Sequence, residues 1–133
     1  MFKLQTADEI TETVKFKLPK GNGKADQFNI KVTFVRHTTT KIKERQDMFA
    51  DNVINVKAGM DANPDCDDKM MLREDVRNIE GVVDPDSEEK MPFDDDLLEN
   101  LMDIPELLTA MMLKWAEVNY GQNTVKVLNR KNA

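Results

Sequence analysis

The chain has 133 residues, a formal net charge of −6 and one cysteine. This length suits one domain, over residues 1–133, that buries its own apolar core without metals or disulfides. The acidic balance disfavours a nucleic-acid binder, which needs a basic face, and one cysteine cannot form an intramolecular disulfide. No stretch approaches the roughly 20 apolar residues of a membrane span. We therefore expect a single domain that binds neither nucleic acid nor a membrane.

Two alternations of apolar and polar residues near the N-terminus predict β-strands. They run from Val14 to Leu18 and from Phe28 to Phe34. Side chains alternate between the faces of a strand, so each strand has one buried face. The segment between them contains Gly21, Asn22 and Gly23, which favour a turn. The sequence thus predicts an antiparallel hairpin with a long basic tip. Helices or another copy of the sheet must cover its apolar face.

The middle of the chain predicts a helix, a loop and a helix followed by an extended segment. Hydroxyls at 38–40 can cap a helix that continues to Lys57. Residues 59–69 are rich in Asp, Asn and Pro and predict a solvated acidic loop. Residues 70–83 favour a short helix and then an extended segment. The ends, 1–10 and 122–133, are expected to be flexible.

The C-terminal part predicts two capped helices. Asp94 is the expected N-cap of the first, and Asp103 that of the second, with Pro105 in its first turn. Gly121 is expected to end the second helix in a left-handed conformation. The fold class is therefore α+β. An N-terminal antiparallel β-hairpin packs against a C-terminal set of about three to four helices, including helices near residues 40–57, 94–102 and 105–120.

No pattern of residues indicates catalysis, so we expect neither an enzyme nor a bound cofactor or metal. His37 has no acidic or cysteine neighbour at catalytic or metal-ligand spacing, and a hydrogen-bonded or exposed imidazole is expected. Aspartates surround Cys66, and they disfavour its thiolate. Runs of carboxylates at helix starts are interpreted as caps.

One acidic segment partly matches a calcium-binding EF-hand loop. Asp61, Asn63, Asp65 and Asp67 have the spacing of its first oxygen ligands. However, Cys66 stands where the loop needs Gly, and the bidentate Glu is replaced by Leu72. A solvated loop is the expected structure, and a small enzyme or calcium-regulated module is the alternative from another class. A calcium titration by calorimetry distinguishes the two.

An apolar face of the two C-terminal helices is the candidate partner-binding surface. Most of this face is expected to form ordinary core that covers the hairpin. Methionine is flexible and polarisable, which suits a surface that meets more than one partner, and the chain has nine. The candidate residues are Phe93, Leu97, Leu101, Met102, Leu108, Met111, Met112 and Trp115.

The order of these features resembles the tail assembly chaperones of long-tailed bacteriophages. The resemblance covers about Val14 to Tyr120 and rests on the hairpin, the helix and two short landmarks. The first landmark is Ile79-Glu80-Gly81-Val82-Val83-Asp84. After an acidic turn, the second is Met91-Pro92-Phe93, which leads into an acidic helix and Asp103-Ile104-Pro105. In similar proteins the position before Glu80 is often aromatic, whereas it is Ile79 here.

This resemblance implies a non-catalytic, late-expressed phage or prophage protein in the host cytoplasm. It would bind the tape measure protein, help recruit tail tube protein subunits and leave before the tail is complete. Apolar faces and the resemblance also imply a homo-oligomer. The alternative is a small structural virion subunit, such as a tail completion or connector protein, that is retained in the particle.

Overall fold

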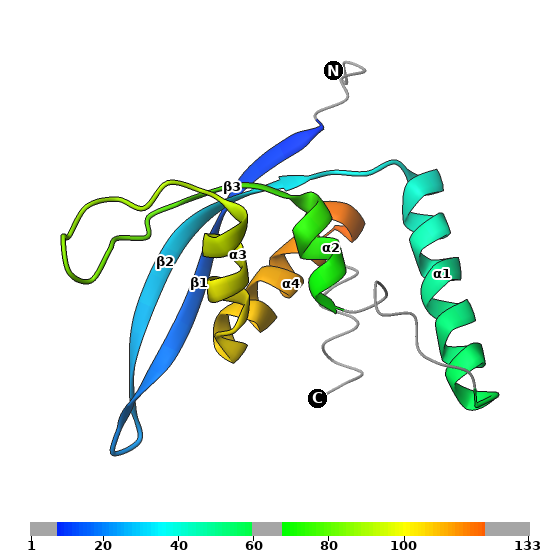
Figure 1. The fold of residues 1–133 in the computed structure, drawn as a ribbon. Coiled ribbons are helices and arrows are strands. Elements are labelled where there is room, and N and C mark those ends of the chain that lie inside the picture. Colours follow the sequence, from blue (N-terminus) through cyan, green and yellow to red (C-terminus); the bar gives the residue numbers. More distant parts are fainter. Residues whose placement is uncertain (1–7, 60–67, 122–133) are drawn as a thin grey trace.

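The computed structural model describes residues 8–59 and 68–121 (Figure 1). The predicted α+β class is confirmed: within these residues the antiparallel hairpin comes first and every helix follows it. In chain order the elements are β1 (Glu9–Gly21), β2 (Lys24–Val35), α1 (Thr39–Lys57), α2 (Asp68–Asp75), β3 (Val76–Glu80), α3 (Asp95–Met102) and α4 (Pro105–Tyr120).

The hairpin of β1 and β2 is longer than the sequence pattern predicted. Its antiparallel pairing runs from Glu9 opposite Val35 to Gly21 opposite Lys24. Asn22 and Gly23 form the turn with φ values of 55° and 73°, and such a pair of positive φ values matches the right-handed twist of the strands. The predicted long tip is therefore wrong. Because β1 begins at Glu9, part of the segment expected to be a flexible end belongs to the sheet.

A third strand joins the sheet beside β2. The order is β1-β2-β3, and β3 is antiparallel to β2, with Lys31 opposite Glu80. This strand is the expected extended segment, although its pairing with β2 was not predicted. The chain then leaves the sheet at Gly81, whose φ of 99° is a conformation that favours glycine. A side chain there would lie 3.6 Å from the Asn29 carbonyl oxygen, which shows how closely the two backbones approach.

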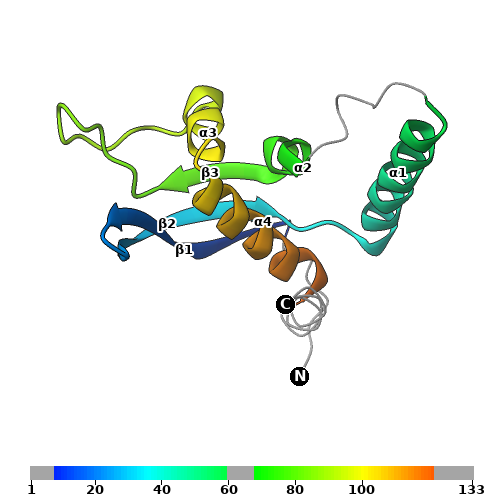
Figure 2. The ribbon, with the colours of Figure 1, turned by 90° about the horizontal axis from the view of Figure 1, so that it is seen from below.

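One apolar core joins the sheet to α2, α3 and α4. These three helices are grouped beside the sheet in both views (Figures 1 and 2). Even-numbered residues of β1 and β2 supply one side of the core because side chains alternate along a strand. The most deeply buried members, each with under 2% of its surface exposed, are Val14, Val32, Phe34, Leu72, Met102, Leu107 and Met111.

Helix α1 stands apart from this core. It lies beyond α2 in both views, and among the described residues it has no extensive backbone contact with another element (Figures 1 and 2). The prediction that this helix packs against the hairpin is therefore wrong. The periodicity of apolar residues predicted its helical conformation, but it did not specify the position of the helix.

The helix ends confirm some of the predicted caps. Asp94 caps α3, because its Oδ1 accepts a hydrogen bond of 2.7 Å from the Leu97 N–H. Asp103 instead ends α3, and Ile104 occupies the N-cap of α4 without a side-chain hydrogen bond. Pro105 begins α4 as expected. Gly121 ends this helix with a positive φ of 90°, which favours glycine, but its ψ of 153° lies outside the predicted left-handed helical region.

Candidate functional site

The first candidate site is a buried carboxylate, Asp75, at the junction of α2 and β3. Its side chain is 1% exposed and accepts four hydrogen bonds. Arg45 donates twice, from Nη1 to Oδ2 at 2.5 Å and from Nη2 to Oδ1 at 2.8 Å. Trp115 Nε1 donates to Oδ2 at 2.6 Å, and His37 Nε2 lies 2.6 Å from Oδ1. The lone-pair positions of both oxygens are thus occupied.

These partners keep Asp75 charged inside the protein. Burial alone raises the pKa of a carboxyl group, but the hydrogen bonds from Arg45, His37 and Trp115 outweigh it and leave the pKa of Asp75 below its ordinary value. The same contact raises the pKa of Arg45 against the effect of burial. A carboxylate with low pKa and no free lone pair is a poor base. The Asp75 cluster (His37, Arg45, Asp75 and Trp115) therefore suits a structural role, in which hydrogen bonds hold distant parts of the chain together.

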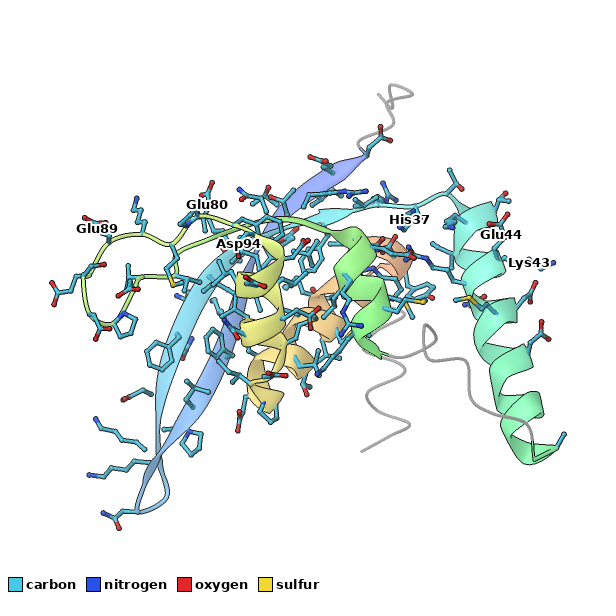
Figure 3. The ribbon with its side chains drawn as sticks, viewed as in Figure 1. His37, Lys43, Glu44, Glu80, Glu89 and Asp94 are labelled. Carbon is cyan, nitrogen blue, oxygen red and sulfur yellow. The ribbon has the colours of Figure 1, made fainter. Side chains whose placement is uncertain are left out.

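The Asp75 cluster joins parts of the chain that are distant in sequence. Arg45 lies in α1 and Trp115 in α4. His37 follows β2 and is labelled in Figure 3. Arg45 also donates to Glu74 Oε2 at 2.6 Å, whereas its buried Nε has no hydrogen-bond partner in the described part of the chain. The predicted hydrogen-bonded imidazole of His37 is confirmed. Its acidic partner was not predicted, because Asp75 lies 38 residues away.

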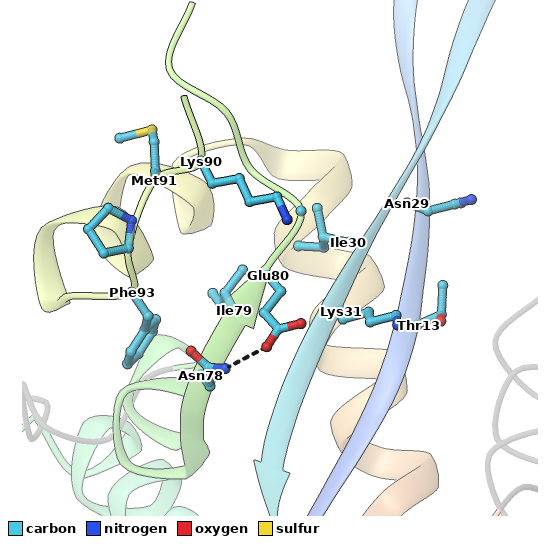
Figure 4. Close-up of a pocket in the computed structure, with 12 residues that line it drawn as sticks. Thr13, Asn29, Ile30, Lys31, Asn78, Ile79, Glu80, Lys90, Met91 and Phe93 are labelled. Carbon is cyan, nitrogen blue, oxygen red and sulfur yellow. Dashed lines mark hydrogen bonds between the residues drawn. The ribbon is translucent and has the colours of Figure 1, made fainter. Parts of the chain in front are cut away.

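The second candidate site is a groove where β3 leaves the sheet (Figure 4). Its volume is about 720 Å³. One wall is formed by β2 and the end of β3, and the other by residues 90–93. Ile30, Ile79, Met91 and Phe93 give it apolar surface. This mixture of apolar surface and strand backbone suits a peptide segment better than a small polar substrate.

The second wall of the groove is held by a small loop of its own. Met91 N–H donates to the Val82 carbonyl at 2.9 Å, and Val83 is bridged to Lys90. At the loop tip, the carboxylate of Asp84 accepts hydrogen bonds from two backbone N–H groups, at 2.8 and 3.0 Å. The bonds from Ser87 and Asp86 hold the pKa of Asp84 below its ordinary value. The acidic turn between the two landmarks is therefore an ordered structure.

The predicted partner-binding residues divide between core and surface. Leu97, Leu101, Met102, Met111 and Trp115 are buried, each at most 8% exposed, so they are inaccessible to a partner in this conformation. Phe93, Leu108 and Met112 are half-buried and lie at the margin of the core. Only these three present surface for binding, and Phe93 also lines the groove. The predicted role in binding stays a prediction.

The acidic loop that partly matches an EF-hand lies mostly outside the described residues. Asp61, Asn63, Asp65, Cys66 and Asp67 all fall between the two described ranges. Over residues 8–59 and 68–121, no group of three or more His, Cys, Asp or Glu side chains is arranged to hold a metal ion. Within the same ranges, none of the helices has the length and apolar character required to cross a membrane.

Comparisons with known proteins give no family assignment. No family model matches the chain, and neither a curated protein nor a solved structure matches it. A functional interpretation therefore rests on the residues and on the geometry of the two candidate sites.

Proposed function

We propose that this chain is a non-catalytic tail assembly chaperone of a long-tailed phage or prophage. It binds the tape measure protein in the host cytoplasm and helps to recruit tail tube subunits. The observation that carries the proposal is the arrangement of the two landmarks. Residues 79–84 and 91–93, on which the resemblance rests, are hydrogen-bonded together and form much of the groove. Residues of both landmarks, Ile79 to Gly81 and Met91 to Phe93, thus lie together around one groove, which supports the proposal.

The chemistry of the surface supports binding of a protein rather than catalysis. The buried Asp75 has its lone pairs occupied by structural partners. The groove combines strand backbone with apolar side chains. Leu108 and Met112 on α4 are separate half-buried apolar side chains at the margin of the core. Weak contacts of this kind, repeated along a long partner, give avidity while each copy remains easy to displace. A chaperone that must leave the tail requires both this avidity and this ease of displacement.

The test is co-expression with the tape measure protein encoded nearby, followed by affinity capture and size-exclusion chromatography. Met112→Asp introduces a charge at the half-buried margin of α4, whereas Asn100→Asp introduces the same charge at an exposed position of α3. We expect a soluble complex with many copies of the chain, lost with Met112→Asp and kept with Asn100→Asp. Circular dichroism must show that both variants fold.

Testing purified virions for this chain distinguishes the proposed chaperone from the alternative structural subunit. A chaperone is absent from finished virions, whereas a tail completion or connector subunit is retained. Failure to form a complex, together with presence of the chain in virions, would overturn the proposal in favour of the structural subunit.

A further inference from the structure

The turn of the hairpin contains the only asparagine of the sequence that is followed by glycine. Asn22 and Gly23 form this two-residue turn between Gly21 and Lys24, which pair across it. Both turn residues have positive φ, 55° and 73°, and Asn-Gly is the preferred pair in such turns. The same pair of residues also has a chemical reactivity that is weaker at the other asparagines of the chain.

The reactive group is the backbone nitrogen that follows an asparagine, because it can attack the side-chain amide. Gly23 leaves this nitrogen accessible: the residue is exposed, and a side-chain carbon built on it would meet no heavy atom within 4 Å. By contrast, Asn29 and Asn100 are also exposed but precede Ile30 and Leu101, whose side chains hinder the attack. Of these three exposed asparagines, the one in the turn is therefore the most reactive.

The position of the turn allows it to open without unfolding of the core. Every residue from 19 to 29 is exposed, whereas Val14 and Ile30 are buried. In Figure 1 the turn lies at the far end of the hairpin, away from α3 and α4. Ring closure requires rotation of the Asn22 backbone, which the folded turn restrains. Exposed loop tips open locally at low free-energy cost, so this restraint is weak.

We propose that Asn22 is a site of spontaneous, irreversible deamidation in the folded chain. The Gly23 nitrogen loses its proton to a base in the solvent and forms a bond to Cγ of Asn22. The side-chain nitrogen takes up a proton from the solvent and leaves as ammonia, so that a succinimide ring remains. Water then breaks one of the two C–N bonds of the ring. Breaking the bond to Cγ gives aspartate, and breaking the bond to the Asn22 backbone carbonyl carbon gives isoaspartate.

Both products change the tip of the hairpin. Each adds a negative charge between Lys20 and Lys24, which are exposed on either side of the turn. Isoaspartate also routes the backbone through the former side chain and lengthens it by one carbon. The pairing of Gly21 with Lys24 then no longer matches a two-residue turn. We expect the modification to loosen the tip and to leave the core of the sheet intact.

Incubation of the purified full chain in mildly alkaline buffer tests the proposal. Peptide mapping by mass spectrometry follows replacement of the amide by a carboxyl group, and enzymatic methylation detects isoaspartate. We expect Asn22 to be converted while Asn29 and Asn100 remain amides. Conversion of all three at the same rate would overturn the proposal. So would a folded chain that keeps Asn22 intact while the chain unfolded in urea is modified there.

Asn22→Gly is the matched control variant. A Gly-Gly pair also suits this kind of turn, so the hairpin is kept while the reactive amide is removed. We expect isoaspartate to disappear from the methylation assay. An undiminished signal in this variant would place the modification elsewhere in the chain and contradict the assignment to Asn22.

Destabilisation of the core distinguishes local opening of the turn from global unfolding. Asp75→Asn removes charge from the buried cluster, which does not include the turn. If the reaction required global unfolding, a loss of about 3 kcal/mol would accelerate it roughly hundredfold. We expect the rate at Asn22 to stay close to the native rate, with the loss of stability confirmed by urea titration. An acceleration that follows this loss would overturn the proposal. The inference involves only the hairpin turn and does not depend on the proposed chaperone role.

Discussion

At the scale of single residues, the buried Asp75 carboxylate holds four side-chain hydrogen bonds. The Arg45 guanidinium of α1, the His37 imidazole that follows β2 and the Trp115 indole N–H of α4 converge on its buried carboxylate. A buried charge is costly unless it is fully paired, and removing one partner leaves the other uncompensated. The cluster is therefore sensitive to changes that alter charge without altering size.

Asp75→Asn tests this sensitivity. The amide has nearly the same shape, but its NH₂ group faces the donors of Arg45 or Trp115. We expect the free energy of unfolding to fall by about 3 kcal/mol in urea titrations. Asp103→Asn is the matched control, because Asp103 forms only an exposed 3.3 Å pair with Lys69, and it should change stability by no more than about 0.5 kcal/mol. Equal losses for the two variants would contradict a special role for Asp75.

The lowered pKa of Asp75 also predicts a dependence on pH. As the pH falls, the unfolded chain binds a proton at Asp75 near its ordinary pKa of 3.8, before the folded chain does. The contribution of the charged Asp75 to the free energy of unfolding is therefore fully present above this value. It is lost as the pH falls through the lower pKa of the folded state. We expect the stability gap between the native chain and Asp75→Asn to stay constant from about pH 7 to about pH 5 and to shrink as the pH falls below about 4. Urea titrations at several pH values measure this gap, and a constant gap would contradict the prediction.

At the scale of elements, Arg45 links α1 to the end of α2 through two ion pairs. Arg45 is the buried polar residue of the helix, and it pairs with both Glu74 and Asp75. Lys43 and Glu44 point away from the rest of the molecule (Figure 3). A helix with few tertiary contacts opens locally at low cost, so its protection against hydrogen exchange reports on the Arg45 contact.

Arg45→Lys tests the attachment of α1. Lysine carries one ammonium group and cannot reproduce the two-point contact of a guanidinium with Asp75. We expect backbone amides in 39–57 to exchange at least about tenfold faster, while those of β1 and β2 change little. Lys43→Ala, an exposed position in the same helix, should leave exchange nearly native. Unchanged exchange in Arg45→Lys would show that other contacts hold α1.

The sequence predicted local features of these elements better than contacts between them. Alternation of apolar residues identified both hairpin strands, and the acid before the helix start identified the Asp94 cap. The prediction that Asp103 caps α4 was wrong, because Ile104 is the N-cap of α4 and Asp103 lies at the end of α3. The Asp75 cluster was missed because Arg45 and Trp115 lie 30 and 40 residues from Asp75. Neither periodicity nor spacing encodes such long-range contacts.

At the scale of the whole molecule, the described residues form a packed body and a helix beside it. The body contains the sheet, α2, α3, α4 and the core that they share. Trp115, the only tryptophan, is 3% exposed inside this body. Its fluorescence therefore reports on the core, whereas far-ultraviolet circular dichroism also reports on α1.

Thermal unfolding should accordingly differ between these two probes. We expect part of the helical signal to be lost at a lower temperature than the change in Trp115 fluorescence, because α1 lacks extensive packing. Circular dichroism and fluorescence recorded on the same sample measure the difference. Coincident transitions would indicate that the chain unfolds as one cooperative unit that includes α1.

The tight Asn22-Gly23 turn and the Asp75 cluster also imply an order of folding. Hairpin pairing joins residues close in sequence and needs little loop closure, whereas the cluster must bring together His37, Arg45, Asp75 and Trp115. The hairpin can therefore form in the transition state before the cluster closes. Breaking the cluster then accelerates unfolding and leaves the folding rate nearly unchanged, so Asp75 sets the lifetime of the folded protein more than its rate of formation.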